Sequence, residues 1–407
     1  MHKRGSVMRS KTAYLAAVVF SFLPTLVSLS QDNTGRDARF VTDPAGDGLE
    51  TIEYFVPHVS TVPATAGEEV VLFVRERVRV HGRRERPAVV MVTGATTSAI
   101  PVFDLEFQQY SWMTHLARAG FDVFVMDLTG YGFSPRPLMD DPCNASTAQQ
   151  QAFLIPNPLS QTCPASFERL LTTPDSDRDE IDTVVDFIRE LRELDRVHLV
   201  GWSRGGARVG SYAAIHPEKV DRLVLFAPNY GQSAPDGPPP DLPLPGFPLD
   251  VQGSAAFWGF WDPDVHCQDQ FDPQIRDHIR DSMLAFDALG AEWGDAGVRR
   301  APGLHGRATQ FWGWNRSFAG RVEAETLLVR GILDTLVGPS QTDPLNEDLR
   351  SPHLYLQIEC GSHFLAWERQ HDILLRASSD WLGDGSFEGL ASGTLYIDRE
   401  GAATLVP

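Results

Sequence analysis

The stretch Val197-His-Leu-Val-Gly-Trp-Ser-Arg-Gly-Gly206 decides the fold of this 407-residue chain. Apolar residues lead into the serine, and a helix-compatible run follows at residues 207–216. The pattern predicts a strand, a one-residue corner at Ser203 and a helix. Glycines two residues before and after a serine allow a turn sharp enough to lift its hydroxyl above the strand end. The backbone N–H of Arg204 would then lie at a helix N-terminus, where it can stabilise a developing oxyanion.

Continuous apolar runs recur along the chain with helical spacing between them. Runs of this kind are typical of strands that are buried on both faces of a parallel sheet. The alternation predicts an α/β fold with a mostly parallel sheet flanked by helices, and a ligand site at the carboxyl ends of the strands. The expected strands are residues 51–59, 69–78, 87–93, 121–126, 197–202, 220–226, 326–330 and 353–358.

Two motifs in this pattern resemble the α/β-hydrolase family. Gly201-Trp202-Ser203-Arg204-Gly205 resembles its G-x-S-x-G nucleophile elbow, and residues 127–134 resemble its D-x-x-G-x-G-x-S loop. The resemblance covers roughly residues 85–382 and implies the α/β-hydrolase fold. We expect Asp127 to organise its own loop rather than to act in chemistry.

Two later strand ends supply the partners that this family uses to activate the serine. Gly331-Ile-Leu-Asp334 resembles its G-x-x-D motif, and Gly361-Ser-His363 resembles its G-x-H loop. The order Ser203, Asp334, His363 is the order of the family's triad, with histidine as the base and aspartate holding its tautomer. An acid after the preceding strand would fall at Pro228-Asn229, which has no carboxylate. His216, His266, His278 and His305 follow no strand end and are expected to be surface or packing residues.

The same resemblance implies two backbone donors for the oxyanion. Arg204 supplies one N–H, and we expect Ala95, after Thr93-Gly94, to supply the other. Many members have His-Gly at this point, so the loop departs from the family pattern. The donor is a backbone group, and the change need not disable it.

The alternating pattern stops between residues 229 and 323. The family places its cap after the sixth strand, so we interpret this segment as a lid. Its tryptophans Trp258, Trp261, Trp312 and Trp314 are candidate substrate contacts. Its aspartates Asp262, Asp264 and Asp269 are expected to move with the lid as it opens.

Serine at the corner narrows the reaction. Dehalogenases and epoxide hydrolases of this family use aspartate there, so an acyl-enzyme mechanism remains. We predict hydrolysis of carboxylic esters, with apolar or aromatic substrates suggested by the lid. One alternative is an aminopeptidase of the proline-releasing type, whose substrate amino terminus a lid aspartate would bind. A second alternative is a non-catalytic binding protein on the same scaffold.

The N-terminal residues of the sequence predict export. Residues 1–30 have a basic start, an apolar run and small residues at Ser28 and Ser30, which is the pattern of a signal peptide cleaved after Ser30. The alternative is an uncleaved anchor, but the apolar run is short for a spanning helix and contains Pro24. The mature protein would be secreted or periplasmic. The remaining chain divides into a disordered linker (31–50), a hydrolase core (51–228) with an insertion at 138–172, the lid (229–323), the rest of the core (324–383) and a tail (384–407) with a hairpin.

Cysteines and charge limit the partners. Export permits disulfides, and Cys143 is expected to pair with Cys163; whether Cys267 and Cys360 pair stays open. We find no zinc-type spacing and expect no metal or cofactor. The net charge of −19 argues against nucleic acid and disfavours docking on an anionic membrane. A small-molecule ester is the expected partner, and the oligomeric state is not predicted.

Overall fold

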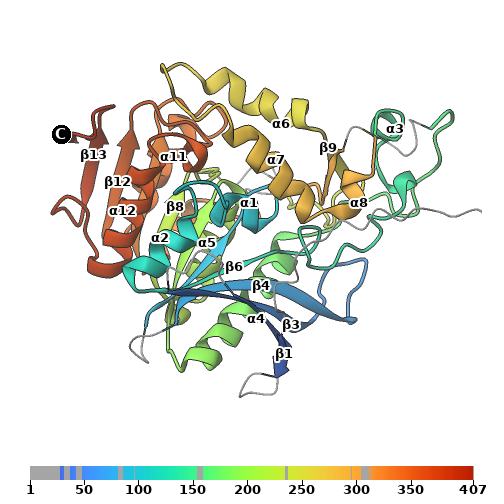
Figure 1. Ribbon diagram of the computed structural model, residues 1–407, viewed down its shortest axis with the longest axis horizontal. Coiled ribbons are helices and arrows are strands. Elements are labelled where there is room, and N and C mark those ends of the chain that lie inside the picture. Colours follow the sequence, from blue (N-terminus) through green and yellow to red (C-terminus); the bar gives the residue numbers. More distant parts are fainter. Residues whose placement is uncertain are drawn as a thin grey trace, which may run out of the picture.

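A single large sheet organises the molecule (Figure 1). The computed structural model describes residues 28–31, 37–42, 48–80, 86–95, 97–153, 159–233, 237–294, 296–303, 311 and 313–406. In this part of the chain the sheet has 12 strands in the order β1-β2-β3-β4-β6-β5-β7-β8-β11-β12-β13-β14. They are β1 (Ser28–Gln31), β2 (Asp37–Thr42), β3 (Leu49–Val59), β4 (Glu69–Arg79), β5 (Ala88–Val92), β6 (Asp122–Met126), β7 (Val197–Trp202), β8 (Val220–Phe226), β11 (Glu325–Gly331), β12 (His353–Ile358), β13 (Gly393–Ile397) and β14 (Ala403–Val406).

The central strands are parallel and buried on both faces. β6, β5, β7, β8, β11, β12 and β13 pair in parallel, whereas β1 to β4 and β14 pair antiparallel. Successive side chains of a strand point to opposite faces, so β5 contributes Val90 to the apolar core on one face and Val89 to the core on the other. Because the carboxyl ends of parallel strands meet at one edge, residues that follow β5, β7, β11 and β12 come together there.

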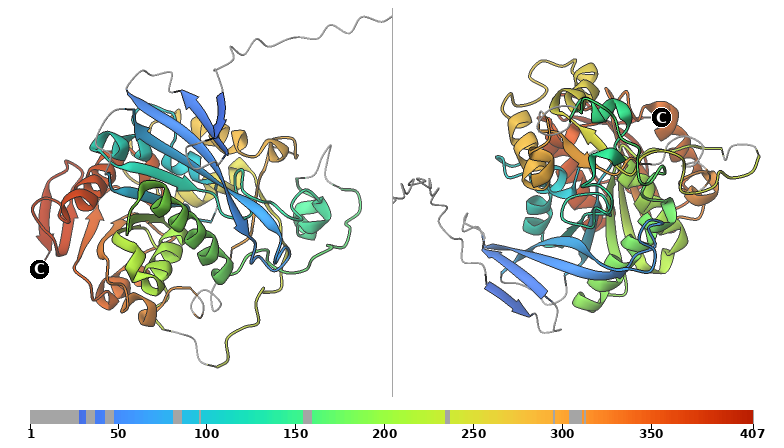
Figure 2. Two further views of the ribbon diagram at one scale, coloured as in Figure 1. Left: turned by 90° about the horizontal axis from the view of Figure 1, so that it is seen from below. Right: turned by 90° about the vertical axis from the view of Figure 1, so that its right-hand side faces the viewer.

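Helices cover both faces, as Figures 1 and 2 show. One apolar core contains side chains of α4 and α5, and the other contains side chains of α1, α2 and α12. The α-helices are α1 (Ala99–Phe103), α2 (Trp112–Ala119), α3 (Thr147–Gln150), α4 (Pro174–Arg192), α5 (Arg204–Ile215), α6 (Ser254–Trp261), α7 (Ile275–Ala285), α8 (Ala288–Ala291), α10 (Arg316–Ala319), α11 (Pro339–Asp348) and α12 (His371–Asp384). The 3₁₀ turns are η1 (Pro142–Asn144), η2 (Pro217–Lys219), η3 (Asp262–Asp264) and η4 (Leu365–Trp367).

Helix α4 begins earlier than its acidic residues suggest. The sequence predicts that this helix begins at Asp177, with Glu180 three residues later as a capping box, and this predicted start is wrong. In the structure Thr173 is the N-cap and Pro174 follows it, while Thr173 and Ser176 form the reciprocal capping bonds. Asp177 and Glu180 are thereby left inside the helix, where they contact the active-site region described below.

The N-terminal region is more ordered than the sequence predicts. Residues 37–42, expected to be disordered, form β2, which pairs with β3. β1 pairs with β2 at the edge of the sheet and spans the expected cleavage site after Ser30 (Figure 2). Most of the expected signal peptide, residues 1–27, lies outside the described residues.

The tail forms the expected hairpin and extends the main sheet. β13 pairs with β14 in antiparallel register and with β12 in parallel register. The parallel pairing was not expected, because it requires the chain to return past α12 to the sheet edge. The tail is therefore part of the sheet rather than an appendage.

The segment between β8 and β11 packs on the hydrolase core and shares its apolar interior. Phe257 and Trp261 of α6 and Ile279 of α7 belong to the same cluster as side chains of α2 and α12. A short antiparallel pair, β9 (Asp250–Gln252) with β10 (Val298–Arg300), holds its two ends together. Its helices α6 and α7 lie at the top of Figure 1, whereas Trp314 and Ala319 of the same segment belong to the apolar core on the other face of the sheet.

Both cysteine pairs are joined. The predicted Cys143–Cys163 disulfide is confirmed, and it closes the insertion at 138–172. The question left open by the sequence is answered by a second disulfide, Cys267–Cys360. Disulfides are typical of proteins in oxidising compartments.

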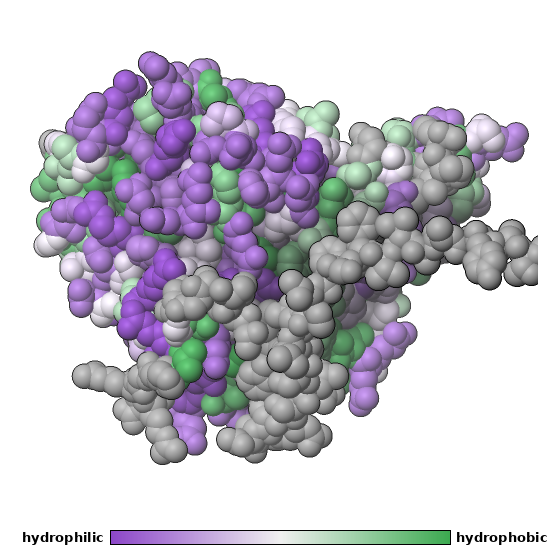
Figure 3. Space-filling model, viewed as in Figure 1, coloured by the Kyte–Doolittle hydropathy of each residue, from purple (hydrophilic) through white to green (hydrophobic). Residues whose placement is uncertain are grey.

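Hydrophilic residues cover most of the upper part of the face seen in Figure 3. Among the helices of the described ranges, none is both long and apolar enough to cross a membrane.

Candidate active site

The corner at Ser203 has the geometry that its glycines allow. Ser203 has φ 57° and ψ −122°, between the end of β7 and the start of α5 at Arg204. A Cβ atom at Gly205 would lie 2.1 Å from the carbonyl oxygen of Val92, and one at Gly201 would lie 2.5 Å from the carbonyl oxygen of Gly205. Larger residues would force the strand, the helix and the end of β5 apart. The glycines therefore permit the strained serine backbone and bring α5 against β5.

Ser203, His363 and Asp334 form one hydrogen-bonded chain. His363 Nε2 lies 2.9 Å from Ser203 Oγ, and His363 Nδ1 lies 2.9 Å from Asp334 Oδ2. Ser203 is 9% exposed, His363 4% and Asp334 4%. A neutral imidazole that donates to the carboxylate through Nδ1 has a free lone pair on Nε2 toward the serine hydroxyl. The arrangement can remove the serine proton and stabilise the resulting imidazolium.

The acid is held by its own loop. Asp334 Oδ1 accepts the backbone N–H groups of Leu336 at 2.9 Å and Val337 at 2.7 Å. These two bonds leave Oδ2 to face the imidazole. The carboxylate is fixed by the turn that follows β11, and its orientation does not depend on the imidazole.

The loop that carries His363 rests on a buried carboxylate, Glu368. Glu368 Oε2 accepts the N–H of Ser362 at 2.8 Å, and Oε1 accepts the Ser362 hydroxyl at 2.6 Å. Oε1 also accepts Trp261 Nε1 at 2.9 Å and Gln270 Nε2 at 2.8 Å. Burial raises the pKa of Glu368, and these donors act in the opposite direction by stabilising its charge. We did not single out Glu368 from the sequence, because nothing local indicates that it is buried.

The 261–270 segment is attached to both triad loops. The Cys267–Cys360 disulfide joins it to the strand end that leads to His363. Asp264 accepts the hydroxyl of Thr335 at 2.6 Å, immediately after the triad aspartate. Our expectation that Asp264 moves with an opening lid is therefore wrong, because this residue is fully buried and bound to the acid loop. Asp262 is exposed and pairs with Arg276 at 2.6 Å, and Asp269 lies in the same segment.

The loop expected to provide the second oxyanion donor lies against the nucleophile. A Cβ atom at Gly94 would lie 3.0 Å from Ser203 Cβ and 3.5 Å from its Oγ, so a larger residue there would crowd the serine. Ala95 follows directly, and the N–H of Arg204 begins α5 on the other side of the corner. The loop after β5 thus lies beside the serine at Gly94, and Arg204 adjoins the serine at the start of α5.

The side chain of Arg204 is directed away from solvent and lies next to Gly303. A Cβ atom at position 303 would fall 1.0 Å from Arg204 Nη1. Burial lowers the pKa of Arg204 to about 10, and Arg208 and Arg300 lower it further. Even so, the guanidinium keeps its charge at neutral pH.

The lid tryptophans do not form one surface. Trp261 is fully buried and packs against Phe271 and Phe364. Trp314 is also fully buried and packs against Tyr230 and the backbone of Gly210 on α5. Trp258, in the middle of α6, is partly exposed. Trp312 lies outside the described residues.

Buried acids support the loops around the site. Asp127 accepts the N–H of Ala99 at 2.7 Å, and burial raises its pKa to about 6. This contact ties the loop after β6 to helix α1. Glu180 accepts the N–H of Thr129 at 2.8 Å, and burial raises its pKa to about 8. Both acids contact backbone groups, as expected of residues that organise loops.

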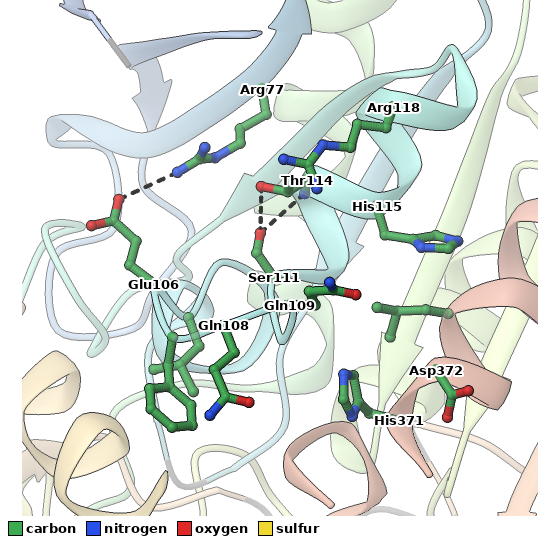
Figure 4. Close-up of a pocket in the computed structure, with 13 residues that line it drawn as sticks. Arg77, Glu106, Gln108, Gln109, Ser111, Thr114, His115, Arg118, His371 and Asp372 are labelled. Atoms are coloured by element: carbon green, nitrogen blue, oxygen red, sulfur yellow. Dashed lines mark hydrogen bonds and ion pairs between the residues drawn. The ribbon is translucent and has the colours of Figure 1, made fainter. Parts of the chain in front are cut away.

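A cavity of about 410 Å³ lies between α2 and α12, apart from the triad (Figure 4). Its lining includes Arg118 and His115 of α2 and His371 and Asp372 of α12, and none of the triad residues. Its side chains carry both signs of charge. In the described ranges we find no group of three or more His, Cys, Asp or Glu side chains that could hold a metal ion.

Comparisons with known proteins agree with this architecture. Residues 87–261 match the model of the family described as alpha/beta hydrolase fold. A meta-cleavage product hydrolase from Pseudomonas fluorescens IP01 shares the fold, with a TM-score of 0.50 and 16% identity over 78% of this chain and 96% of that chain. The family match over residues 87–261 and the structural likeness show that this chain has the α/β-hydrolase fold.

Two curated relatives match shorter parts. A 2-hydroxy-6-oxononadienedioate/2-hydroxy-6-oxononatrienedioate hydrolase of Comamonas testosteroni is 26% identical over 201 residues, 47% of this chain and 64% of that protein. A poly(3-hydroxyalkanoate) polymerase subunit of Allochromatium vinosum is 38% identical over 73 residues, 18% of this chain and 21% of that protein. The chain therefore spans less than two thirds of the length of either relative.

Proposed function

We propose that this chain is an exported serine hydrolase that cleaves carboxylic esters through an acyl-enzyme on Ser203. The observation that carries the proposal is the chain of two hydrogen bonds, each 2.9 Å, from Ser203 Oγ through His363 to Asp334. A serine hydroxyl is a weak nucleophile until a base removes its proton, and this arrangement provides that base.

Each residue has a defined step. His363 Nε2 takes the proton from Ser203 as Oγ attacks the ester carbonyl, and Asp334 stabilises the imidazolium. The N–H groups of Ala95 and Arg204 bind the oxyanion. The imidazolium then protonates the leaving alcohol, and an acyl-serine remains. Water attacks the acyl group with His363 again as the base, which releases the acid and restores Ser203.

A second candidate is hydrolysis of a carbon–carbon bond, because some of the similar proteins are hydrolases of meta-cleavage products. The alignment to the 2-hydroxy-6-oxononadienedioate/2-hydroxy-6-oxononatrienedioate hydrolase favours it, since it covers almost half of this chain. The proline-releasing aminopeptidase has less support. Asp264 accepts the hydroxyl of Thr335, and Asp262 pairs with Arg276, so neither carboxylate is presented to a substrate amino terminus. Asp269 is exposed and is the remaining candidate for that role.

A labelling experiment tests the catalytic proposal. A fluorophosphonate probe should modify the wild-type protein at Ser203, and Ser203→Ala should abolish labelling without lowering the melting temperature. Ser379→Ala, a serine of α12 remote from the triad, is the matched control and should label normally. Labelling of Ser203→Ala at another residue would contradict the mechanism, and absence of labelling in the wild type would favour the non-catalytic alternative.

Substrate panels then separate the reactions. p-Nitrophenyl esters of increasing acyl length, a proline anilide and 2-hydroxy-6-oxo-6-phenylhexa-2,4-dienoate should be compared by kcat/KM. The ester proposal requires the highest value for an ester. A higher value for the dienoate would assign carbon–carbon hydrolysis instead.

Export is tested on the full chain. Expressed in a bacterium with a periplasm, the protein should lose residues 1–30 and begin at Gln31. Cleavage there would remove three of the four residues of β1, which is an edge strand, and leave β2 onward intact. Recovery of the uncleaved chain in the cytoplasm would contradict the proposal.

A further inference from the structure

The loop that lies against Ser203 is held through its carbonyl groups. Arg208 Nη1 donates to the carbonyl oxygens of Thr93 at 3.1 Å and Gly94 at 3.0 Å. The carbonyl of Ala95 accepts Arg300 Nη1 at 2.7 Å and the hydroxyl of Tyr131 at 3.0 Å. Three consecutive carbonyls after β5 therefore have side-chain donors.

These bonds determine where the neighbouring N–H groups point. In a planar trans peptide the C=O and the N–H of the next residue point in opposite directions. Because Arg208 binds the Gly94 carbonyl, the N–H of Ala95 is directed away from Arg208. A donor bound to a peptide carbonyl also polarises the N–H of that peptide and makes it a better donor.

Arg208 is itself fixed. It is 6% exposed on α5, and its Nε donates to Asp177 Oδ2 on α4 at 2.8 Å. Burial acts to lower the pKa of Arg208, but Asp177 and Tyr131 outweigh it and the pKa is raised. A charged, immobile guanidinium thus connects two helices to the loop beside the nucleophile.

We propose that Arg208, held by Asp177, is a positioning residue that orients the Gly94–Ala95 peptide so that Ala95 N–H serves the oxyanion hole. This inference rests on the proposed function and deepens it. Arg208 does not touch the substrate and acts only through the peptide. This contact also explains how the loop can be held in place with Thr93-Gly94 where many family members have His-Gly, because the Arg208 guanidinium fixes the loop through its carbonyl groups.

Arginine is required by this geometry. The planar guanidinium of Arg208 lets Nε bind Asp177 while Nη1 binds two carbonyl oxygens. A lysine has one ammonium group on a flexible side chain and cannot reproduce this arrangement. We therefore expect Arg208→Lys to recover part of the stability and little of the activity. Removal of one oxyanion donor costs about 100-fold to 1,000-fold in kcat, and misalignment of one should approach the lower value.

The experiment compares Arg208→Gln, Arg208→Lys and Asp177→Asn with the wild type. For an ester that the wild type hydrolyses, kcat should fall about 30-fold to 100-fold in Arg208→Gln with little change in KM. The inhibition constant of a trifluoromethyl ketone, which forms an oxyanion on the serine, should rise by the same factor. Inhibition by the product alcohol, which has neither a carbonyl nor a negative charge to place in the oxyanion hole, should be unchanged. The double variant Asp177→Asn/Arg208→Gln should have a kcat no lower than that of Arg208→Gln, because both changes remove the same contact between Arg208 and the Gly94 carbonyl.

Arg192→Gln is the matched control for loss of a carboxylate-paired arginine that does not contact the loop beside Ser203, although Arg192 is partly exposed. Arg192 lies on α4 and pairs with Asp122 at 2.7 Å, and it also pairs with Glu76. This variant should lower the melting temperature and leave the ketone constant unchanged. Should Arg208→Gln fail to fold, Asp177→Asn carries the same test with a smaller change.

The outcomes separate the two claims. If folded Arg208 and Asp177 variants keep kcat and the ketone constant within about threefold of wild type, the inference is wrong and the serine mechanism stands. If their losses in kcat only follow their losses in stability, as in Arg192→Gln, the role is structural and the inference is also wrong. If the wild type reacts with neither ester nor fluorophosphonate, the proposed function fails and the inference fails with it.

Discussion

Replacement of Asp334 by asparagine tests the triad at its acid, whose orientation is fixed by backbone hydrogen bonds. Asp334 Oδ1 accepts two backbone N–H groups, from Leu336 and Val337, at 2.9 and 2.7 Å. An asparagine must keep its carbonyl oxygen toward these donors, so its NH₂ group replaces Oδ2 opposite His363. Two donors would then face each other across the 2.9 Å contact unless the imidazole changes tautomer.

The change of the His363 tautomer determines how far kcat should fall. With the proton on Nε2, His363 can no longer accept the proton of Ser203, and no carboxylate stabilises an imidazolium. We expect kcat to fall about 100-fold to 10,000-fold, or about 3 to 5 kcal/mol in activation free energy, with little change in KM. The residual rate should rise with pH, because hydroxide can then act in place of the base.

The assay is ester hydrolysis under steady-state conditions from pH 6 to 10, with melting temperature as the check on folding. Asp262→Asn, an exposed aspartate of the inserted segment, is the matched control and should keep the wild-type kcat. A folded Asp334→Asn variant within tenfold of wild type, or a larger loss in Asp262→Asn, would refute the assignment of the acid.

Two further predictions concern the supports of the site. The double variant Cys267→Ala/Cys360→Ala should lose about 2 to 4 kcal/mol of stability and at least about tenfold in kcat, because the loop before His363 loses its attachment. The double variant Cys143→Ala/Cys163→Ala should lose stability but keep its kcat. Equal kcat values in the two double variants would contradict this reasoning. Glu180 has a pKa of about 8 in the folded protein against its ordinary 4.5, so the folded state retains a proton that the unfolded state releases, and stability should fall as pH rises from about 5 to 8 by up to about 1.4 kcal/mol per unit. In Glu180→Gln, denaturant unfolding should show this slope reduced by one proton, and an unchanged slope would show that the carboxyl titrates normally.

The sequence was informative where a side chain's role follows from its place on a strand end. Ser203, Asp334 and His363 each follow a buried strand, and parallel strands bring their carboxyl ends to one edge. Glycine spacing around Ser203 predicts the corner, because few other residues tolerate that approach. The start of α4 was predicted wrongly at Asp177, because Asp177 and Glu180 have the spacing of a capping box, whereas the structure forms the reciprocal capping bonds between Thr173 and Ser176.

The fold class, the order of the triad residues and the Cys143–Cys163 pair were determined by the sequence itself, because periodicity, strand-end motifs and proximity along the chain are local properties. Tertiary structure alone decided how the site is supported. Arg208 meets Gly94 across 114 positions, Trp261 meets Glu368 across 107, and Cys267 meets Cys360 across 93. No local pattern encodes these contacts, since each depends on how α5 and the inserted segment pack against the sheet. From the sequence, a buried arginine or glutamate cannot be distinguished from a solvent-exposed one. Only its burial with particular partners in the folded protein makes it part of the site.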